Sequence, residues 1–270
     1  MKVDLHLHTT QSDGLLDPPA LVQAVARAGL DYFAVTDHDT MAAYELHAPV
    51  FAAHAARLIP GVELSTSADG KEIHILGYGI SPACPALHDL VAQRGGLRMR
   101  RAERIVRALN AAGVALHLGD VLALATGASV GRAHIARALV ASGGARDMED
   151  AFSRYLGAGA VAYVPLPGIT PQQAIAAVRA CGGVAVLAHP ARSQADALIP
   201  ELRRAGLQGI EAYAPSHDLH EVARYRSLAA ALDLAITAGS DFHQATALHP
   251  QPGVELEADE LAPFLALLAR

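Results

Sequence analysis

Short apolar runs that end in histidine, aspartate or glutamate recur along this chain of 270 residues, and they limit most strongly how it can fold. VDLHLH, GVAVLAHP and AITAGSDFH are three such runs, and stretches with a helical pattern separate them. Apolar runs of this length are typical of strands in a parallel sheet that is covered on both faces. About seven of them, mostly alternating with helices, predict an α/β fold.

Polar side chains follow nearly every predicted strand, and this favours a barrel over an open sheet. In a barrel of parallel strands, the C-terminal strand ends converge on one site. In an open sheet, only the strand ends near the switch point would meet. We therefore expect an irregular α/β barrel with its polar strand ends gathered into one site.

Local signals place several elements. Val3, Leu5 and Leu7 alternate with polar residues, which is the pattern of a strand. Asp17–Pro18 and Thr170–Pro171 each combine a helix N-cap with proline at the first helical position. The runs LIPGVELSTS and KEIHILGYGI are expected to form a hairpin around the turn SADG.

The pattern becomes helical from about Pro82 to Ala160, where RMRRAERIVRALNAAG is the clearest helix. We expect two further helices near Val130–Ser142 and Met148–Leu156. The chain is therefore interpreted as a barrel domain formed by residues 1–81 and 161–270, with a helical insertion of residues 82–160.

Composition excludes some classes of partner. The net charge of −6 provides no broad basic field for duplex DNA or a membrane surface. We find no apolar run of transmembrane length and no signal peptide. Cys84 and Cys181 lie in no paired motif, so we expect a reducing compartment, no disulfide and a cytoplasmic location.

His6 and His8 present a burial problem on the first predicted strand. Residues i and i+2 of a strand face the same side, and two buried imidazoles are costly unless they find partners. A metal ion is one such partner and binds the neutral ring. A structural hydrogen bond is the alternative for each strand-end histidine taken alone. The candidate polar residues at strand ends are His6, His8, Asp13, His38, Glu63, His74, His134, His189, Asp241 and His243.

Seven motifs occur in this order along the chain: DLHLHTTQSDG, VTDHDT, GVE, EIHILGYG, GRAHIARAL, AHPAR and GSDFH. This series resembles that of the PHP (polymerase and histidinol phosphatase) family of metal-dependent phosphoesterases. The segments GRAHIARAL and AFSRYLGAGAVAYVP resemble one branch, which contains nucleoside-3',5'-bisphosphate phosphatases and 5'-to-3' oligoribonucleases. Ala133 departs from that branch, which usually has proline at this position.

The resemblance implies a distorted (β/α)7 TIM-like barrel that binds two or three divalent ions. We expect manganese, with zinc or iron as alternatives, since mixed histidine and carboxylate ligands suit these metals. The implied ligand sets are His6, His8, Glu63 and Asp241 for the first metal; Glu63, His74 and His134 for the second; and Asp13, His38 and His243 for the third.

The implied reaction is hydrolysis of a phosphate ester. Hydroxide held between metals would attack phosphorus in line, with no covalent enzyme intermediate. Glu63, Asp241 and His189 are the expected catalytic residues. His189 would contact the phosphate or protonate the leaving oxygen, unless it is a structural strand-end residue. Arg132 and Arg192 would bind phosphate oxygens, and a second, non-reacting phosphate held there would explain a preference for bisphosphates.

The arginines of the predicted insertion helix have two interpretations. We favour a solvated helix face, and the alternative is that part of the set extends the phosphate-binding surface. The residues are Arg98, Arg100, Arg101, Arg104 and Arg107.

The leading hypothesis is a phosphatase that removes the 3'-phosphate of nucleoside 3',5'-bisphosphates such as adenosine 3',5'-bisphosphate. A 5'-3' exoribonuclease acting on short RNA is the close alternative. Histidinol phosphatase is a third enzyme hypothesis, against which the GRAHIARAL segment argues. A non-catalytic, metal-stabilised scaffold is the alternative from a different class.

Overall fold

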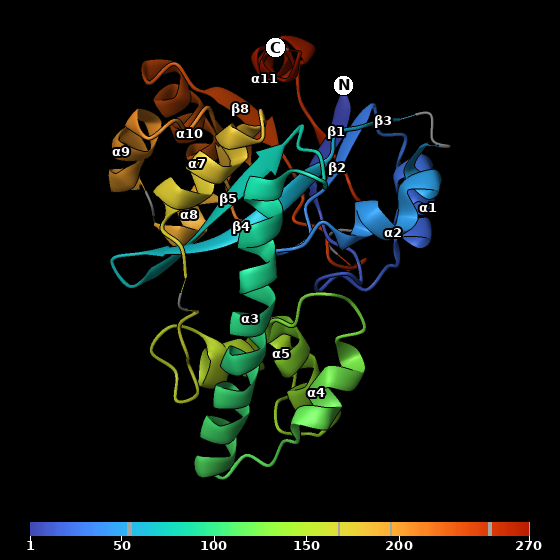
Figure 1. Cartoon of the computed structure of the whole chain (residues 1–270), viewed down its shortest axis with the longest axis vertical. Helices are drawn as coiled ribbons and strands as arrows, with labels where there is room; N and C mark the ends of the chain where they lie inside the picture. Colours follow the sequence, from blue (N-terminus) through green and yellow to red (C-terminus); the bar gives the residue numbers. More distant parts are fainter. Residues whose placement is uncertain (53–55, 167, 195, 248–249, 270) are drawn as a thin grey trace.

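The computed structural model describes residues 1–52, 56–166, 168–194, 196–247 and 250–269, and it has an α/β fold. One part contains two sheets with helices around them, and the other part is helical (Figure 1). The first sheet has the order β3 (Arg57–Leu58), β2 (Tyr32–Val35), β1 (Lys2–Leu7) and β9 (Val254–Glu255). The second has the order β4 (Gly61–Ala68), β5 (Lys71–Tyr78), β6 (Val184–Leu187), β7 (Gly209–Tyr213) and β8 (Ala235–Ala238).

The strand directions match the sequence prediction in part. β1 pairs in parallel with β2, and β6, β7 and β8 are parallel neighbours. The predicted hairpin is confirmed, since β4 and β5 pair in antiparallel register around Asp69 and Gly70. Both turn residues have positive φ, 49° and 75°, as a two-residue type I′ turn requires. β5 is also antiparallel to β6, so the second sheet is mixed.

Short backbone contacts join the two sheets where their strands end. Phe242, just after β8, exchanges hydrogen bonds with β1: His8 N donates to Phe242 O at 3.0 Å, and Phe242 N donates to His6 O at 3.2 Å. Asp39 N, beyond β2, donates to Glu63 O in β4 at 2.8 Å. These contacts bring strand ends from both sheets to one place.

Helices cover the outer faces of the sheets. Their starts agree with the sequence signals, because Asp17 accepts from Ala20 N and Thr170 accepts from Gln173 N. The helices of this part are α1 (Pro18–Ala28), α2 (Ala42–Ala52), α7 (Pro171–Ala180), α8 (Pro190–Ser193), α9 (Ile199–Arg204), α10 (Leu219–Ala231) and α11 (Ala258–Leu268), with a 3₁₀ turn at Asp196–Leu198.

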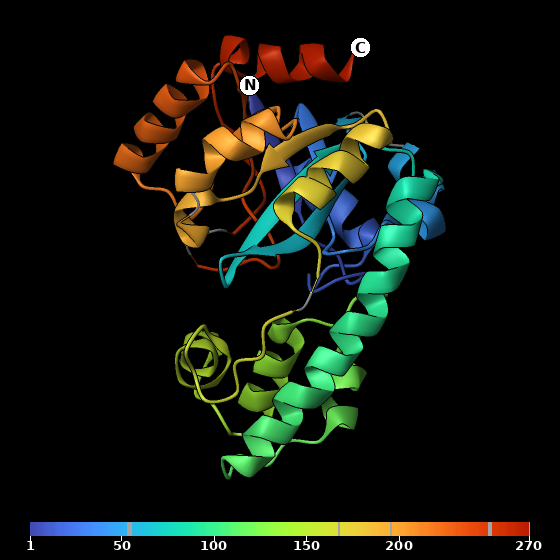
Figure 2. The same ribbon diagram turned by 60° about the vertical axis from the view of Figure 1, so that its left-hand side comes forward.

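The predicted helical segment contains one long helix that belongs to both parts of the molecule (Figure 2). Leu87, near its start, packs in the main hydrophobic core. Ile105 and Leu109 pack in a second core, whose residues lie between Ala102 and Val164. The elements are α3 (Pro85–Ala111), α4 (Leu118–Leu124), α5 (Arg132–Ala141), α6 (Met148–Ala151) and a π-helical turn at Phe152–Leu156.

The expectation that no disulfide forms is wrong. Cys84, just before α3, is bonded to Cys181, just after α7. The two residues are separated by 97 positions in the chain, so their spacing carries no motif, and packing of α3 against α7 brings them together. Cys84 and Cys181 therefore do not indicate a reducing compartment.

The part of the chain that the structure describes contains no helix with the length and apolar character needed to cross a membrane. Both termini lie at the end of the molecule opposite the helical part (Figure 1). Since β1 starts at that end, its C-terminal end, with His6 and His8, faces the helical part.

Candidate metal centre

Eight of the nine predicted metal ligands converge from the ends of β1, β2 and β8 and from within β4 and β5. They form three overlapping groups, in each of which one ligand atom per residue lies within 4.8 Å of the others. The groups are His6, His8, Glu63 and Asp241; His38, Glu63 and His74; and His8, Asp13, His38 and His243. We refer to these eight residues as the ligand cluster.

The first group contains His6, in β1, and His8, which directly follows β1, and both face the same carboxylates, as the alternation predicts. His6 Nε2 lies 3.3 Å from Glu63 Oε2 and 3.5 Å from Asp241 Oδ1. His8 Nε2 lies 3.4 Å and 3.2 Å from the same two oxygens. Burial, with the nearby His243, lowers the pKa of His8 to about 3, so this ring is neutral and free to bind a metal.

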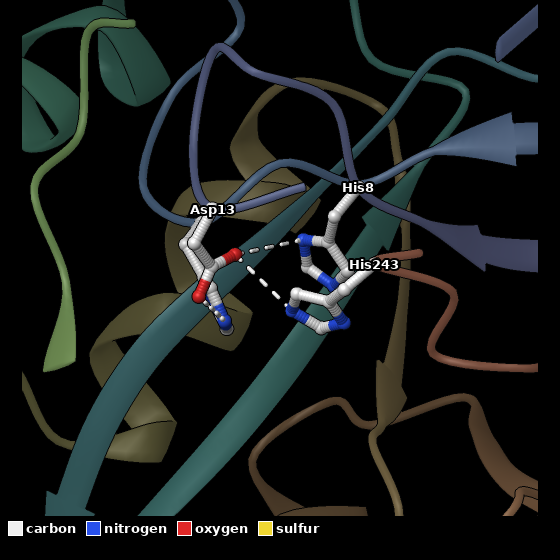
Figure 3. Close-up of side chains that lie close together, drawn as sticks. His8, Asp13 and His243 are labelled. Carbon is white, nitrogen blue, oxygen red and sulfur yellow. Dashed lines mark ion pairs between the residues drawn. The ribbon is translucent and has the colours of Figure 1, made fainter. Parts of the chain in front are cut away.

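Asp13, His8 and His243 point toward one another from the loop after β1, the end of β1 and the segment after β8 (Figure 3). Asp13 Oδ1 lies 3.1 Å from His243 Nε2 and 3.8 Å from His8 Nδ1. Asp13 Oδ2 lies 3.8 Å from His38 Nε2. His8 thus contributes a nitrogen to two groups, whereas the sequence reasoning assigned it to one.

Glu63 lies between the groups, and its two oxygens face different neighbours. Oε2 lies 2.8 Å from His38 Nδ1 and also faces the β1 histidines. Oε1 lies 2.6 Å from His74 Nδ1 and 3.2 Å from His189 Nε2. A carboxylate placed in this way has the geometry of a ligand that bridges two cations.

Several polar atoms of the cluster are buried close to atoms of opposite charge, but none of them has a neighbour in hydrogen-bond geometry. They include His6 Nε2, His8 Nε2, His38 Nδ1 and Glu63 Oε2. Buried polar atoms of this kind are rare because each costs the free energy of its lost hydration. Since these atoms face one another and are the donor types that divalent transition metals prefer, the residues fit a metal centre.

The carboxylates and histidines of the cluster shift one another's pKa. Burial alone would raise the pKa of Glu63, but His38, His74 and His6 outweigh it and hold the pKa well below its ordinary value. Burial would lower the pKa of His243, but Asp13 and Asp241 raise it to about 9. Glu63 likewise raises the pKa of His74 to about 9. Glu211, Glu63 and Asp241 also raise the pKa of His6 well above its ordinary value, against the effect of burial. Three rings therefore hold protons at neutral pH that a metal would displace.

His134 is the predicted ligand that lies outside the three groups, as far as the described residues extend. It is buried at the third position of α5, and its Nδ1 accepts a hydrogen bond from Gly131 N at 3.0 Å. The neutral ring therefore carries its proton on Nε2, and binding a metal requires a change of tautomer or of this hydrogen bond. His38 occupies the place beside Glu63 and His74 that His134 was expected to take.

Glu211 was missed by the sequence reasoning. It is fully buried in β7, where Oε1 accepts a hydrogen bond from His6 Nδ1 at 2.9 Å and Oε2 accepts one from His189 N at 2.8 Å. This contact turns His6 Nε2 toward Glu63 and Asp241, as carboxylates commonly do for metal-binding histidines. The signal was present, since GIEAY places an acidic residue inside an apolar strand.

Two further buried carboxylates support the loops that carry ligands. Asp37 accepts hydrogen bonds from Thr9 N and Ser12 Oγ, at 2.7 and 2.6 Å, and so fixes the loop that leads to Asp13. Asp4 accepts hydrogen bonds from the backbone and side chain of Ser240, the residue before Asp241.

The backbone itself is unusual at two strand ends of the site. Asp241 has φ of 48° and His189 has φ of 27°, both in the left-handed region that side chains other than glycine rarely adopt. Such strain persists only where surrounding contacts hold it, and it is concentrated at functional sites.

A cavity of about 230 Å³ lies over the ligand cluster and has arginines in its walls. Arg132 and Arg192, the predicted phosphate contacts, both line it. Arg132 Nη2 donates to Glu72 Oε2 at 2.6 Å, and Arg192 Nη1 lies 3.3 Å from Asp241 Oδ2.

The prediction that the arginines of α3 are exposed to solvent is confirmed for three of them and wrong for two. Arg100, Arg104 and Arg107 are exposed. Arg98 and Arg101 are buried and line the cavity. Arg98 Nε donates to Asp39 Oδ2 at 2.7 Å, and Arg101 Nε donates to Val164 O at 2.7 Å. These partners, distant in sequence, could not be recognised from the helix alone.

His189 also lines the cavity, at the end of β6. Its Nε2 lies 3.2 Å from Glu63 Oε1, its ring stacks near that of His6, and its Nδ1 is buried without a hydrogen-bond partner. Burial lowers the pKa of His189, so the ring is neutral at pH 7.

This chain is similar in sequence to bacterial enzymes over most of its length. The 5'-3' exoribonuclease Rnm of Salmonella typhimurium is 39% identical over 267 residues, which cover 94% of this chain and 87% of that protein. The 3',5'-nucleoside bisphosphate phosphatase of Chromobacterium violaceum is 35% identical over 248 residues, which cover 89% of this chain and 87% of that protein.

A solved structure of an amidohydrolase from Chromobacterium violaceum, with bound sulfate and no metal, is similar to this fold throughout. The TM-score is 0.88 at 31% identity, with 97% of this chain and 96% of that chain covered. The model of the PHP domain matches residues 4–160, and the chain therefore belongs to the PHP domain family.

Proposed function

We propose that this protein is a metal-dependent phosphomonoesterase that removes the 3'-phosphate from nucleoside 3',5'-bisphosphates such as adenosine 3',5'-bisphosphate. The observation that carries the proposal is the convergence of buried, unpartnered histidine nitrogens and carboxylates beneath a cavity walled by arginines. The phosphatase of Chromobacterium violaceum, similar over nearly the whole chain, supports the choice of substrate.

The ligand cluster would hold two or three divalent ions, manganese before zinc or iron. His6, His8, Glu63 and Asp241 would hold one ion, and Glu63 would share a second with His74 and with His38 or His134. Asp13 and His243 would belong to a third with His38. When bound, such ions would neutralise the phosphate and make water a better nucleophile.

The protein's own side chains would position the substrate. Arg132 and Arg192 would hold phosphate oxygens at the cavity wall, where guanidinium groups bind them in pairs of hydrogen bonds. His189, neutral at pH 7, would donate a hydrogen bond to the phosphate. The lowered pKa of His189 favours this hydrogen-bonding role over the alternative, in which a protonated His189 acts as the general acid for the leaving oxygen.

A 5'-3' exoribonuclease acting on short RNA is the second candidate, because the relative from Salmonella typhimurium is similar over 94% of this chain and carries that name. Both reactions would use the same ligand cluster. Short RNA is then a partner in addition to small nucleotides, whereas duplex DNA and membranes are not proposed as partners. The cytoplasm is the proposed location because these nucleotide and RNA substrates occur there, and no longer because of the cysteines.

We also propose that the two sheets act together as an irregular (β/α)7 barrel, with residues 1–81 and 161–270 as its domain and residues 82–160 as the insertion. The single bridges Leu7–Phe242 and His38–Glu63, which link the sheets, support this description.

The test is a direct comparison of two substrates with added Mn²⁺. Release of phosphate from adenosine 3',5'-bisphosphate is measured against release of mononucleotides from a 5'-phosphorylated oligoribonucleotide. A higher kcat/KM for the bisphosphate supports the proposal, a higher kcat/KM for the RNA favours the second candidate, and activity on neither contradicts both.

A further inference from the structure

The cavity over the ligand cluster continues outward between the β4–β5 hairpin and the helical part of the chain. This outer lobe has a volume of about 470 Å³. It shares Glu72, His74, Arg132, Phe152, His189 and Arg192 with the inner cavity. The buried ligands close the inner end, so a substrate whose phosphate lies at the cluster places its organic part in this lobe.

One wall of the outer lobe is aromatic and comes from the helical part. Phe152 begins the π-helical turn after α6, and Tyr163 lies in the segment that leads back to the sheets. Neither ring is fully buried. Gly157 and Ala158, which lie between them in the chain, add no large side chain to the wall.

The facing wall is polar and comes from the sheet part. Gly70 and Lys71 at the tip of the hairpin face Ser193, the last residue of α8, and Gln194, which follows it. Lys71 Nζ donates to Gln194 O at 3.2 Å and ties the two segments together. A lobe with one aromatic wall and one polar wall suits a flat group that has an apolar face and a polar edge.

We propose that the outer lobe binds the nucleobase of the substrate, stacked against the aromatic wall of Phe152 and Tyr163. This rests on the proposed function and names the part of the substrate that gives specificity. Every nucleobase offers a π face, so stacking recognises a base with little preference among the four. Arg132 Cζ lies 5.8 Å from the centroid of the Phe152 ring, which places the base next to a proposed phosphate contact.

A binding site for the base predicts that nucleotides bind more tightly than sugar phosphates that lack a base. The direct measurement is calorimetric binding of adenosine 5'-monophosphate and ribose 5-phosphate to the Mn²⁺-loaded protein. We expect the nucleotide to bind about 5- to 100-fold more tightly, the range given by aromatic–base stacking. Tyr163→Leu should remove much of this difference with little effect on ribose 5-phosphate. Phe152→Leu also removes the ring beneath Arg132, so it should weaken both ligands, and the nucleotide more than ribose 5-phosphate.

Three control variants keep the test specific. Phe152→Tyr and Tyr163→Phe retain the rings and should keep the preference for the nucleotide. Tyr32→Leu removes a ring at the start of β2, next to Arg57 and away from the cavity, and should change neither affinity. Circular dichroism checks that each variant is folded. The ratio of the two ligand affinities in the wild-type protein tests the proposal without any variant.

Two outcomes overturn the proposal: equal binding of both ligands by the wild type, or equal loss of both ligands in the leucine variants. These binding measurements do not depend on catalysis, so they distinguish failure of this proposal from failure of the proposed function. If the protein binds the nucleotide more tightly but releases no phosphate from the bisphosphate, the proposed reaction is contradicted and the proposed binding site for the base is still supported.

Discussion

Two buried clusters of charged side chains adjoin one another, and they differ in how well their polar atoms are paired. In the first, the Asp39 carboxylate accepts hydrogen bonds from Arg98 Nε at 2.7 Å and Ser65 N at 3.0 Å. Arg94 Nε lies 3.3 Å from the same carboxylate. The positive charges of Arg98 and Arg94 outweigh the effect of burial and lower the pKa of Asp39. The Asp39 carboxylate is therefore ionised, and the arginines balance its charge.

In the second cluster, around Glu63, several buried atoms have no hydrogen-bond partner, although Asp39 N donates to the backbone oxygen of Glu63 itself. The cluster with paired charges and the cluster with unpaired polar atoms are therefore direct neighbours. The difference indicates separate tasks: the Asp39 cluster holds α3 against the sheets, and the Glu63 cluster is arranged for ligands that the protein alone does not supply.

The largest expected effect comes from Glu63→Gln. We expect kcat/KM for the phosphate ester to fall about 1,000-fold or more, because metal ions contribute several kcal/mol to the transition state and Glu63 would bridge two of them. The stability of the metal-free protein should change little above about pH 9, where His74 has lost the proton that pairs it with Glu63. Phosphate release and urea unfolding measure the two quantities. A variant that loses stability but keeps its activity would favour the scaffold hypothesis.

Asp39→Asn is the matching change in the paired cluster, and it should act on stability. Arg98 would remain buried without its carboxylate, and breaking one side of a buried ion pair costs about 3 to 5 kcal/mol. Urea unfolding of the metal-free protein measures this loss. If the loss is below about 1 kcal/mol, the Asp39 cluster does not have the structural role that separates it from the ligand cluster.

Glu211→Gln should have an intermediate effect, and it tests how His6 is oriented. Carboxylates that hold metal-binding histidines typically contribute 10- to 100-fold to metal affinity. We expect a loss of about that size in Mn²⁺ or Zn²⁺ affinity, measured by competition with a chelator. Glu201→Gln, at an exposed position of α9, is the control. Unchanged affinity in Glu211→Gln would remove this role.

The effect of pH is gradual, and it is the smallest of the four when taken per ring and per pH unit. His74 and His243 have their pKa raised from 6.5 to about 9. Their contribution to the stability of the metal-free protein is therefore complete below pH 6.5 and is lost as the pH rises toward 9. Each proton changes the free energy of unfolding by at most about 1.4 kcal/mol per pH unit.

Denaturant melts from pH 6 to 9, with and without Mn²⁺, measure this effect. Bound metal requires neutral rings, so metal should abolish the alkaline loss, and its affinity should rise over the same range. A metal-free protein whose stability is constant from pH 6.5 to 9 would show that the two rings do not hold these protons.

Much of this architecture could be predicted from local patterns. The alternation in β1 placed His6 and His8 on one face, and the SADG turn identified the β4–β5 hairpin. Asp17 and Thr170 marked helix starts. These features depend on neighbouring residues only, and side-chain alternation and capping operate at that range.

Contacts between distant segments could not be predicted in the same way. The Cys84–Cys181 disulfide, the Arg98–Asp39 pair and the bond from Glu211 to His6 each depend on packing of elements far apart in the chain. An arginine on α3 has the same local pattern whether its helix face meets solvent or a buried carboxylate. His8 joins two ligand groups for the same reason, since its second neighbour, His243, comes from the far end of the chain.

The most direct test of the central claim is metal binding itself. Metal-free protein is titrated with Mn²⁺ and with Zn²⁺ in a calorimeter, in two buffers of different ionisation enthalpy. We predict at least two bound ions per chain with micromolar or tighter affinity, and release of protons at pH 7 as His6, His74 and His243 become neutral. Absence of binding below millimolar metal, with no proton release, would contradict the assignment of the unpaired cluster as a metal centre.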